Sequence, residues 1–278
     1  MPKKNIVWIA SYPKSGNTWT RIFLANYLIN APRPVPLNQL SKVMTGDGVA
    51  QHFRAVNNGH FDPNDRMGNL AARRRVLQRF AGNGADLNLI KTHNLNADRL
   101  GHKLIPSGVT KAALYVVRHP LDTAISYSRH LGWTPDETVA FLSRSDTGTT
   151  SDSENAEQYL GSWSDHVASW TQARGFPVFV MRYEDLLESP APVFGDMLSF
   201  IGLDPDPARL EKAVRFSTFD EAKRQEASAP FRENPGNHPT FFTEGRAGQW
   251  QDVIDHRTAM EFARSHRKMM RKFNYTVD

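Results

Sequence analysis

The sequence predicts an α/β protein in which helices flank a central, mostly parallel sheet in three layers. Four short apolar runs, rich in β-branched and aromatic residues, lack strict apolar/polar alternation, which is typical of strands buried on both faces. They cover residues 6–10, 87–90, 112–117 and 178–181. Helical patterns separate these runs, and this alternation favours parallel strands joined by helices. A chain of 278 residues is expected to form a single domain over residues 1–278.

The helices are predicted from apolar spacing and from residues that favour helix ends. Residues 18–30 have apolar side chains spaced for one buried face, and Pro32 ends the helix. Pro120 and Asp122 favour a helix start and predict a helix over residues 122–130. Further helices are expected over residues 159–174, 192–201 and 257–272. Residues 143–155 and 226–246 show little periodicity and are expected to be exposed loops or lids over a site.

The amino-acid composition limits the kinds of chemistry that this chain can perform. The chain has no cysteine, which excludes disulfides, thiolate zinc sites and cysteine nucleophiles. A net charge of +5 and a pI near 9.4 suit an anionic ligand, although a solvated surface explains them equally well. No apolar run is long enough to span a bilayer or to form a signal peptide. A cytoplasmic protein is expected, without membrane insertion and without a nucleic-acid partner.

The first chemical motif joins the first strand to the first helix, in residues 11–17. Such a junction directs backbone N–H groups and the positive helix end at an anion, and Gly16 lets the backbone approach it closely. Lys14 adds a charge, and Ser15 and Thr18 add hydroxyl groups. These features predict a phosphate cradle and a P-loop-like fold, with simple capping of the helix as the alternative.

This loop differs from the magnesium-nucleotide loop G-x-x-x-x-G-K-[ST]. Its lysine precedes Gly16 instead of following it, no glycine opens the loop, and position 10 is alanine. No metal site is predicted here or elsewhere, because spacings such as HExxH are missing from the sequence.

Two further motifs follow buried strands. Arg118 ends one strand and Ser126 lies two helical turns later, so both can face the crevice where open α/β sheets bind ligands. A guanidinium suits a phosphate, although Arg118 could instead pair with Asp122. Lys91 and His93 lie two residues apart in extended chain, which directs both side chains into one pocket. Histidine is suited to taking a proton from a hydroxyl.

Together these motifs resemble the cytosolic-type sulfotransferases that use 3′-phosphoadenosine 5′-phosphosulfate (PAPS). The segment YPKSGNTW resembles that family's 5′-phosphosulfate loop, and RHPLDTAISYSRH resembles its 3′-phosphate element. KTH resembles its catalytic strand, while MRYEDLLESP and FSTF resemble segments beside the adenine. The match extends over about residues 6–250.

The resemblance implies PAPS as the donor, 3′-phosphoadenosine 5′-phosphate (PAP) as the product, and no required metal. It implies that His93 is the general base, that Lys14 hydrogen-bonds the oxygen leaving with the nucleotide, and that Lys91 steadies the sulfuryl oxygens. Arg118 and Ser126 would read the 3′-phosphate, and Ser126 is counted with the catalytic group as well. The remaining implied donor-binding residues are Ser15, Gly16, Asn17 and Thr18 at the 5′-phosphate, and Trp19, Tyr183, Ser217, Thr218 and Phe219 near the adenine.

The C-terminal part departs from the animal pattern. An Arg-Lys-Gly run is replaced by Thr243, Glu244 and Gly245, which leaves Arg246 as the nearest cation for the 3′-phosphate. The pattern FxxEGR resembles bacterial members that modify peptide antibiotics. The family's dimer motif is poorly matched around residues 253–261, so a homodimer and a monomer both stay open.

The acceptor is expected to be a hydroxyl of a small molecule or natural product. If the family architecture holds, residues 34–86 and the two irregular segments form its pocket, including the aromatic side chains of His52, Phe53, His60 and Phe61. The basic cluster Arg73, Arg74, Arg75 and Arg79 could attract an acidic acceptor, but a solvated helix face is favoured. Two alternatives to sulfuryl transfer stay open: a small-molecule kinase of similar architecture, and a nucleotide-binding protein without catalysis.

Overall fold

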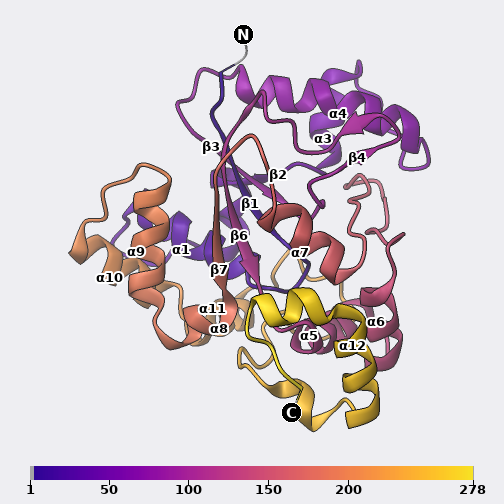
Figure 1. Ribbon diagram of the computed structural model, residues 1–278. Helices are drawn as coiled ribbons and strands as arrows, with labels where there is room; N and C mark the ends of the chain where they lie inside the picture. The colour runs from indigo at the N-terminus through magenta and orange to yellow at the C-terminus, as the bar shows by residue number, and fades with distance from the viewer. Residues whose placement is uncertain (1–2, 278) are drawn as a thin grey trace.

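The computed structural model describes residues 3–277 and contains a five-stranded parallel sheet between two layers of helices (Figure 1). The strands are ordered β2-β3-β1-β6-β7. Their bounds are β1 (Ile6–Ser11), β2 (Thr45–Gly46), β3 (Asn88–Thr92), β6 (Thr110–Val117) and β7 (Val178–Arg182). Every pairing in this sheet is parallel, which confirms the α/β prediction. A separate antiparallel hairpin pairs β4 (Asp98–Arg99) with β5 (His102–Lys103).

Both faces of the sheet are buried. In β1, Trp8 and Ala10 point into one core, and Val7 and Ile9 point into the other. All six residues of β1 are buried, which explains why the strand reads as one continuous apolar run.

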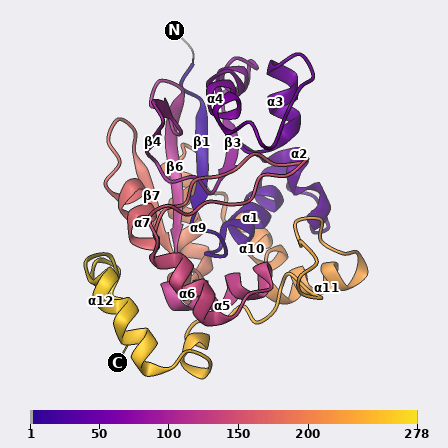
Figure 2. The same ribbon diagram turned by 90° about the vertical axis from the view of Figure 1, so that its right-hand side faces the viewer.

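Each face of the sheet has its own layer of helices (Figure 2). One core includes residues of α1 (Asn17–Ile29), the short helices η1 (Leu37–Gln39) and α2 (Leu40–Val43), and α8 (Tyr183–Glu188), α9 (Pro190–Phe200), α10 (Pro207–Phe216) and α11 (Phe219–Ser228). The other includes residues of α3 (Ala50–Val56), α4 (Arg66–Ala81), α5 (Pro120–Leu131), α6 (Pro135–Ser143), α7 (Trp163–Thr171), η2 (Gln249–Asp252) and α12 (His256–Lys272). Within residues 3–277, no helix is long and apolar enough to cross a membrane.

All five expected helices are present, with one clear difference in where a helix begins. Helix α7 begins at Trp163 and not at residue 159, because Gly161 adopts a left-handed conformation (φ 66°) and Ser162 caps the helix with its side chain. Residues 144–155 are irregular, as expected, and the irregular segment continues to residue 162; bridges from Val49 to Asn155 and from Gly148 to Tyr159 hold it in place.

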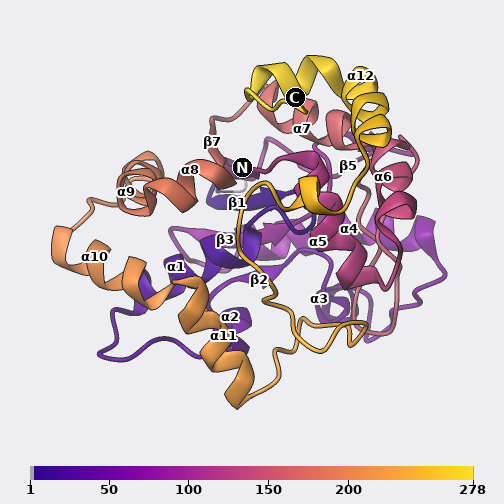
Figure 3. The same cartoon turned by 90° about the horizontal axis from the view of Figure 1, so that it is seen from below.

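The carboxyl ends of the strands meet at one edge of the sheet, which Figure 3 shows from below. Strand β1 lies between β3 and β6, so the loops that follow these three strands are neighbours. In an open α/β sheet this position, where the strand order reverses, is the usual ligand crevice. Residues 229–248, which we call the crossing segment, contain no helix or strand and pass over this edge between α11 and η2 (Figure 3).

Candidate active site

A cavity of about 420 Å³ opens at the carboxyl edge of the sheet. All the residues predicted for the site line this cavity, except Ser15 and Arg246. Three of the loops that contribute follow β1, β3 and β6, and the crossing segment supplies several further lining residues. The sequence motifs therefore converge on one place, although they lie more than a hundred residues apart in the chain.

The loop after β1 leaves the start of helix α1 open to the cavity. Lys14 (φ 65°) and Gly16 (φ 111°) both adopt left-handed conformations, and no side chain caps the helix at Gly16. A Cβ atom on Gly16 would lie 2.9 Å from the ring of Tyr183, so the close packing requires glycine. The first backbone N–H groups of α1 are thus available to an anion.

Several buried polar atoms of the loop and its neighbours have no hydrogen-bond partner within residues 3–277, among them Ser15 Oγ, Asn17 Oδ1, Trp19 Nε1 and Arg118 Nε. Buried polar groups are normally satisfied, so such a group beside a cavity is suited to a ligand. The amide nitrogen of Asn17 does have a partner, because it donates to the carbonyl of Ile9 at 2.9 Å and fastens the loop to β1.

Lys14 lies among other charges. Its Nζ is 3.4 Å from the centroid of the Phe241 ring. Burial, followed by the positive charges of Arg118 and Lys91, lowers the pKa of Lys14 to about 7 against the opposing effects of Glu233 and Glu226. This ammonium group therefore gains or loses its proton near neutral pH.

His93 is held as a neutral base. Its Nδ1 lies 2.9 Å from the carbonyl oxygen of Ser11. Because a carbonyl can only accept, Nδ1 carries the proton and Nε2 keeps a free lone pair. Burial and then the charge of Lys91 hold the pKa of His93 well below its usual value. The backbone N–H of His93 also donates to Gln158 at 2.6 Å, which fixes its position.

A carboxylate that the sequence did not identify joins the site. Glu233, in the crossing segment, accepts from Lys91 Nζ at 3.0 Å and from both terminal nitrogens of Arg21 at 2.7 and 3.0 Å. Burial alone would raise the pKa of Glu233, but the two cations outweigh it and lower the pKa below its usual range. The signal in the sequence was Arg21, a charge within an apolar helix face that needs a counter-charge when buried.

Arg118 is buried and points into the cavity. Its terminal nitrogens donate to the carbonyl oxygens of Lys14 at 3.2 Å and Arg246 at 3.0 Å, and its guanidinium lies 4.4 Å from the ring centroid of Tyr183. The alternative pair with Asp122 does not form. Asp122 instead accepts from the backbone N–H groups of Gly248 and Trp250, and so anchors η2 to α5.

Arg246 lies outside the cavity lining. Its guanidinium pairs with Glu244 at 2.8 Å and with Asp252 at 2.5 Å, and half of its side chain is exposed. The structure therefore does not bring the Arg246 side chain to the other predicted binding residues.

Comparison with known proteins shows which family the chain belongs to. The family model described as a sulfotransferase domain matches residues 4–274. The chain belongs to the sulfotransferase family. Cytosolic sulfotransferase 17 of Arabidopsis thaliana is 24% identical over 275 residues, covering 91% of this chain and 70% of that protein. Sulfotransferase 1A1 of the dog, Canis lupus familiaris, is 27% identical over 176 residues, covering 60% of this chain but only 56% of that protein.

Solved structures of other proteins share the fold. A mouse sulfotransferase in complex with PAP aligns with a TM-score of 0.63 and 19% identity, covering 98% of this chain and 84% of that one. Retinol dehydratase in complex with androsterone and PAP aligns with a TM-score of 0.65 and 17% identity, covering 96% of this chain and 81% of that one. These similarities confirm the P-loop-like α/β architecture of the sulfotransferase chain.

The expected acceptor region differs in the structure. Among the described residues that line the cavity, none comes from residues 34–86, whereas Thr149 comes from one irregular segment and Phe241 from the other. His52 instead lies 2.6 Å from the hydroxyl of Thr45, and His60 is exposed. The aromatic residues expected in that region are used for local packing, including the contact between Phe53 and Phe61.

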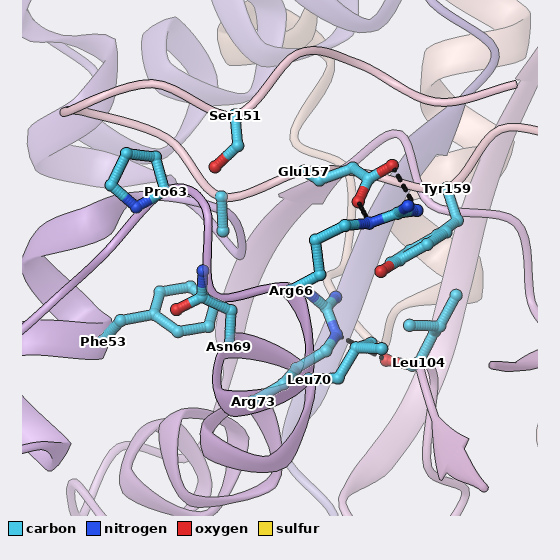
Figure 4. A pocket seen from close by; sticks show the side chains of 11 residues that line it. Phe53, Pro63, Arg66, Asn69, Leu70, Arg73, Leu104, Ser151, Glu157 and Tyr159 are labelled. Atoms are coloured by element: carbon cyan, nitrogen blue, oxygen red, sulfur yellow. Dashed lines mark hydrogen bonds and ion pairs between the residues drawn. The ribbon is translucent and has the colours of Figure 1, made fainter. Parts of the chain in front are cut away.

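The basic cluster is also only partly solvated. Arg73 is buried, donates to the carbonyl of Leu104 and pairs with Asp47, so the prediction of a solvated face was wrong for this residue. It was confirmed for Arg74 and Arg75, which are exposed. Figure 4 shows Arg73 in a second, small cavity beside Leu70 and Leu104.

Proposed function

We propose that this protein transfers the sulfuryl group of PAPS to a hydroxyl of a small-molecule or natural-product acceptor. The observation that carries the proposal is the meeting of an open phosphate loop, a neutral His93 and the ammonium group of Lys91 in one cavity. Membership of the sulfotransferase family supports it, as do the related folds that were solved with PAP.

The residues around the cavity fit such a donor. The open start of α1 suits the 5′-phosphate, and the buried guanidinium of Arg118, which lines the same cavity as Ser126, suits the 3′-phosphate. Trp19, Tyr183 and Phe219 line the cavity where a flat adenine would pack; Ser217 and Thr218 lie beside them.

In the proposed step the acceptor oxygen forms a bond to sulfur while the bond between sulfur and the bridging oxygen breaks. The proton of the acceptor hydroxyl passes to Nε2 of His93, which is unprotonated. Lys14 stabilises the negative charge that develops on the departing bridging oxygen, and Lys91 stabilises the sulfuryl oxygens. A sulfuryl group carries less charge than a phosphoryl group, so lysines and loop amides are suited to the task.

Calorimetric titration with PAP and with ATP, in EDTA and again with magnesium, tests the donor class. We expect PAP to bind and ATP to bind much more weakly, because only PAP offers a 3′-phosphate. A preference for ATP that depends on magnesium would contradict the proposal and favour the kinase alternative. Binding of PAP without turnover of any hydroxyl acceptor would favour a nucleotide-binding protein without catalysis.

Replacing the general base tests the mechanism. We expect His93→Ala to lower turnover by about 100-fold or more, within the range that positioned acid–base groups contribute, while PAP affinity changes little. The exposed His60→Ala is the matched control and should keep full turnover. Retained turnover in His93→Ala, measured with a sulfated product assay, would remove His93 from the proposed mechanism.

A further inference from the structure

Four polar side chains gather at the α5 end of the cavity. Ser126, Thr243 and Gln249 line the cavity itself. Directly behind them lies Arg129, whose NH1 donates to Thr243 Oγ1 at 3.2 Å and to Gln249 Oε1 at 3.1 Å. Ser126 and Arg129 are three residues apart on α5, so they lie on neighbouring positions of one helix face.

The acidic partner of Arg129 is shared with a second arginine. Glu244 accepts from Arg129 at 2.6 Å through one oxygen and from Arg246 at 2.8 Å through the other. The Arg246 side chain is half exposed and also pairs with Asp252, whereas only 26% of the Arg129 side chain is exposed. Arg129 thus faces the cavity side of Glu244, and Arg246 faces the solvent side.

A 3′-phosphate at this end of the cavity carries more negative charge than Arg118 alone can neutralise. A 3′-phosphate carries nearly two negative charges at neutral pH. Arg118, a buried cation in the same cavity lining as Ser126, brings one positive charge; one N–H of each terminal nitrogen donates to a backbone carbonyl, and Nε has no partner within residues 3–277.

We propose that Arg129 is a donor-binding residue of this protein. When the donor binds, Arg129 gives up its ion pair with Glu244 and supplies the second guanidinium to the 3′-phosphate. The inference rests on the proposed function, because it assigns this end of the cavity to the 3′-phosphate. Exchange is favourable because Glu244 keeps Arg246 as its partner when Arg129 turns to the phosphate. The paired geometry of a guanidinium suits a phosphate better than a single amide contact does.

The test compares two nucleotides and three variants by calorimetry. PAP carries the 3′-phosphate, and adenosine 5′-monophosphate lacks it. We expect Arg129→Gln to lower PAP affinity by about tenfold or more, as for a lost hydrogen bond to a charged group, and to change affinity for adenosine 5′-monophosphate by less than about twofold. Arg129→Lys should recover part of the loss because it keeps the charge. Arg257→Gln removes the same charge from an exposed residue of α12 that pairs with Glu261 away from the cavity, and it should change neither affinity by more than about twofold.

The outcomes separate this inference from the proposed function. If the unaltered protein binds PAP no more tightly than adenosine 5′-monophosphate, there is no 3′-phosphate subsite and both proposals fail. If the unaltered protein prefers PAP and Arg129→Gln keeps the full preference, only the role of Arg129 is overturned. An equal loss for both nucleotides would show that Arg129 only braces the crossing segment. An equal loss of PAP affinity in Arg257→Gln would show that the loss reflects net charge and would overturn the role of Arg129.

Discussion

Lys14 makes donor binding depend on pH. Its pKa is lowered to about 7 by burial and by Arg118 and Lys91, with Glu233 and Glu226 opposing them. An anionic ligand binds the charged ammonium, so above pH 7 binding requires uptake of a proton, whereas below pH 7 the proton is already present. We expect PAP affinity to fall as pH rises from about 7.5 to 9, a range in which the phosphates themselves stay fully ionised.

Calorimetry in buffers of different ionisation enthalpy measures this proton uptake directly. At pH 8 PAP binding should take up close to one proton, and Lys14→Met should abolish that uptake. Affinity that does not change over this pH range, together with no proton uptake, would contradict the lowered pKa.

Gly245 permits a close approach at the adenine side of the cavity. It adopts a left-handed conformation (φ 66°), and a Cβ atom there would run into the ring of Phe219. We expect Gly245→Ala to displace that ring and to lower PAP affinity, in addition to a strain of about 1 kcal/mol from the backbone. Gly236→Ala is a matched control in the same crossing segment, because its φ of 87° is also left-handed but nothing lies within 4 Å.

Both substitutions should lower the free energy of unfolding through backbone strain, and Gly245→Ala by the larger amount because its Cβ also displaces Phe219, as measured by urea denaturation. Only Gly245→Ala should weaken PAP in a binding titration. Equal PAP affinity in the two variants would show that Phe219 does not contact the adenine.

The site residues that could be recognised from the sequence are those that belong to short local motifs. Lys14 and Gly16 follow a strand and precede a helix, and His93 lies two residues from Lys91, so each motif could be interpreted from its neighbours alone. Glu233 has no such local context. It reaches Lys91 only because the crossing segment folds back over the sheet edge, across 142 residues of sequence. Long-range placement of an irregular segment leaves no periodic pattern in the sequence.

At the scale of elements, a buried network ties β3 to α4. Asp47, just after β2, is fully buried; it pairs with Arg73 of α4 and accepts from Thr92 of β3 at 2.8 Å and from Asn94 at 3.3 Å. We expect Asp47→Ala to lower the free energy of unfolding by about 3–5 kcal/mol, because it leaves the Arg73 charge buried without compensation.

Urea denaturation with a double variant checks the cause. Asp47→Leu combined with Arg73→Met should be less destabilised than Asp47→Ala, since no charge is left unpaired. The exposed pair of Arg144 and Asp146 supplies the control, and Asp146→Ala should leave the unfolding midpoint unchanged. A double variant as unstable as Asp47→Ala would indicate that the network stabilises the fold through packing and not through the pairing of charges.

The elements found from the sequence were those with long uninterrupted patterns. The strands β1, β3, β6 and β7 were predicted because burial on both faces leaves apolar runs. Strand β2 has only two residues, which is too short for any periodicity. Helices α10 and α11 were missed because they are mostly polar; each has few buried residues and rests on α1 or η1 at the margin of the fold.

At the scale of the whole molecule, the two helix layers are joined through one sheet. The two cores use alternate residues of the same strands, so neither core can form without β1 and β6. The cavity draws on both layers as well, since α1 and α11 lie on one side and α5 on the other. We therefore propose that the chain folds as a single domain, and that a ligand in the cavity stabilises both layers together.

Differential scanning calorimetry with and without PAP tests this proposal. We expect one cooperative transition, which PAP moves upward as a whole by roughly 5 °C at a hundred times its dissociation constant, because that concentration adds about 2.7 kcal/mol to the stability of the folded state. His60→Ala should show the same shift as the unaltered protein, whereas Arg118→Gln, which removes a buried guanidinium from the cavity lining, should show a smaller one. Two separate transitions, of which PAP moves only one, would contradict the single domain and would mean that the two layers unfold independently.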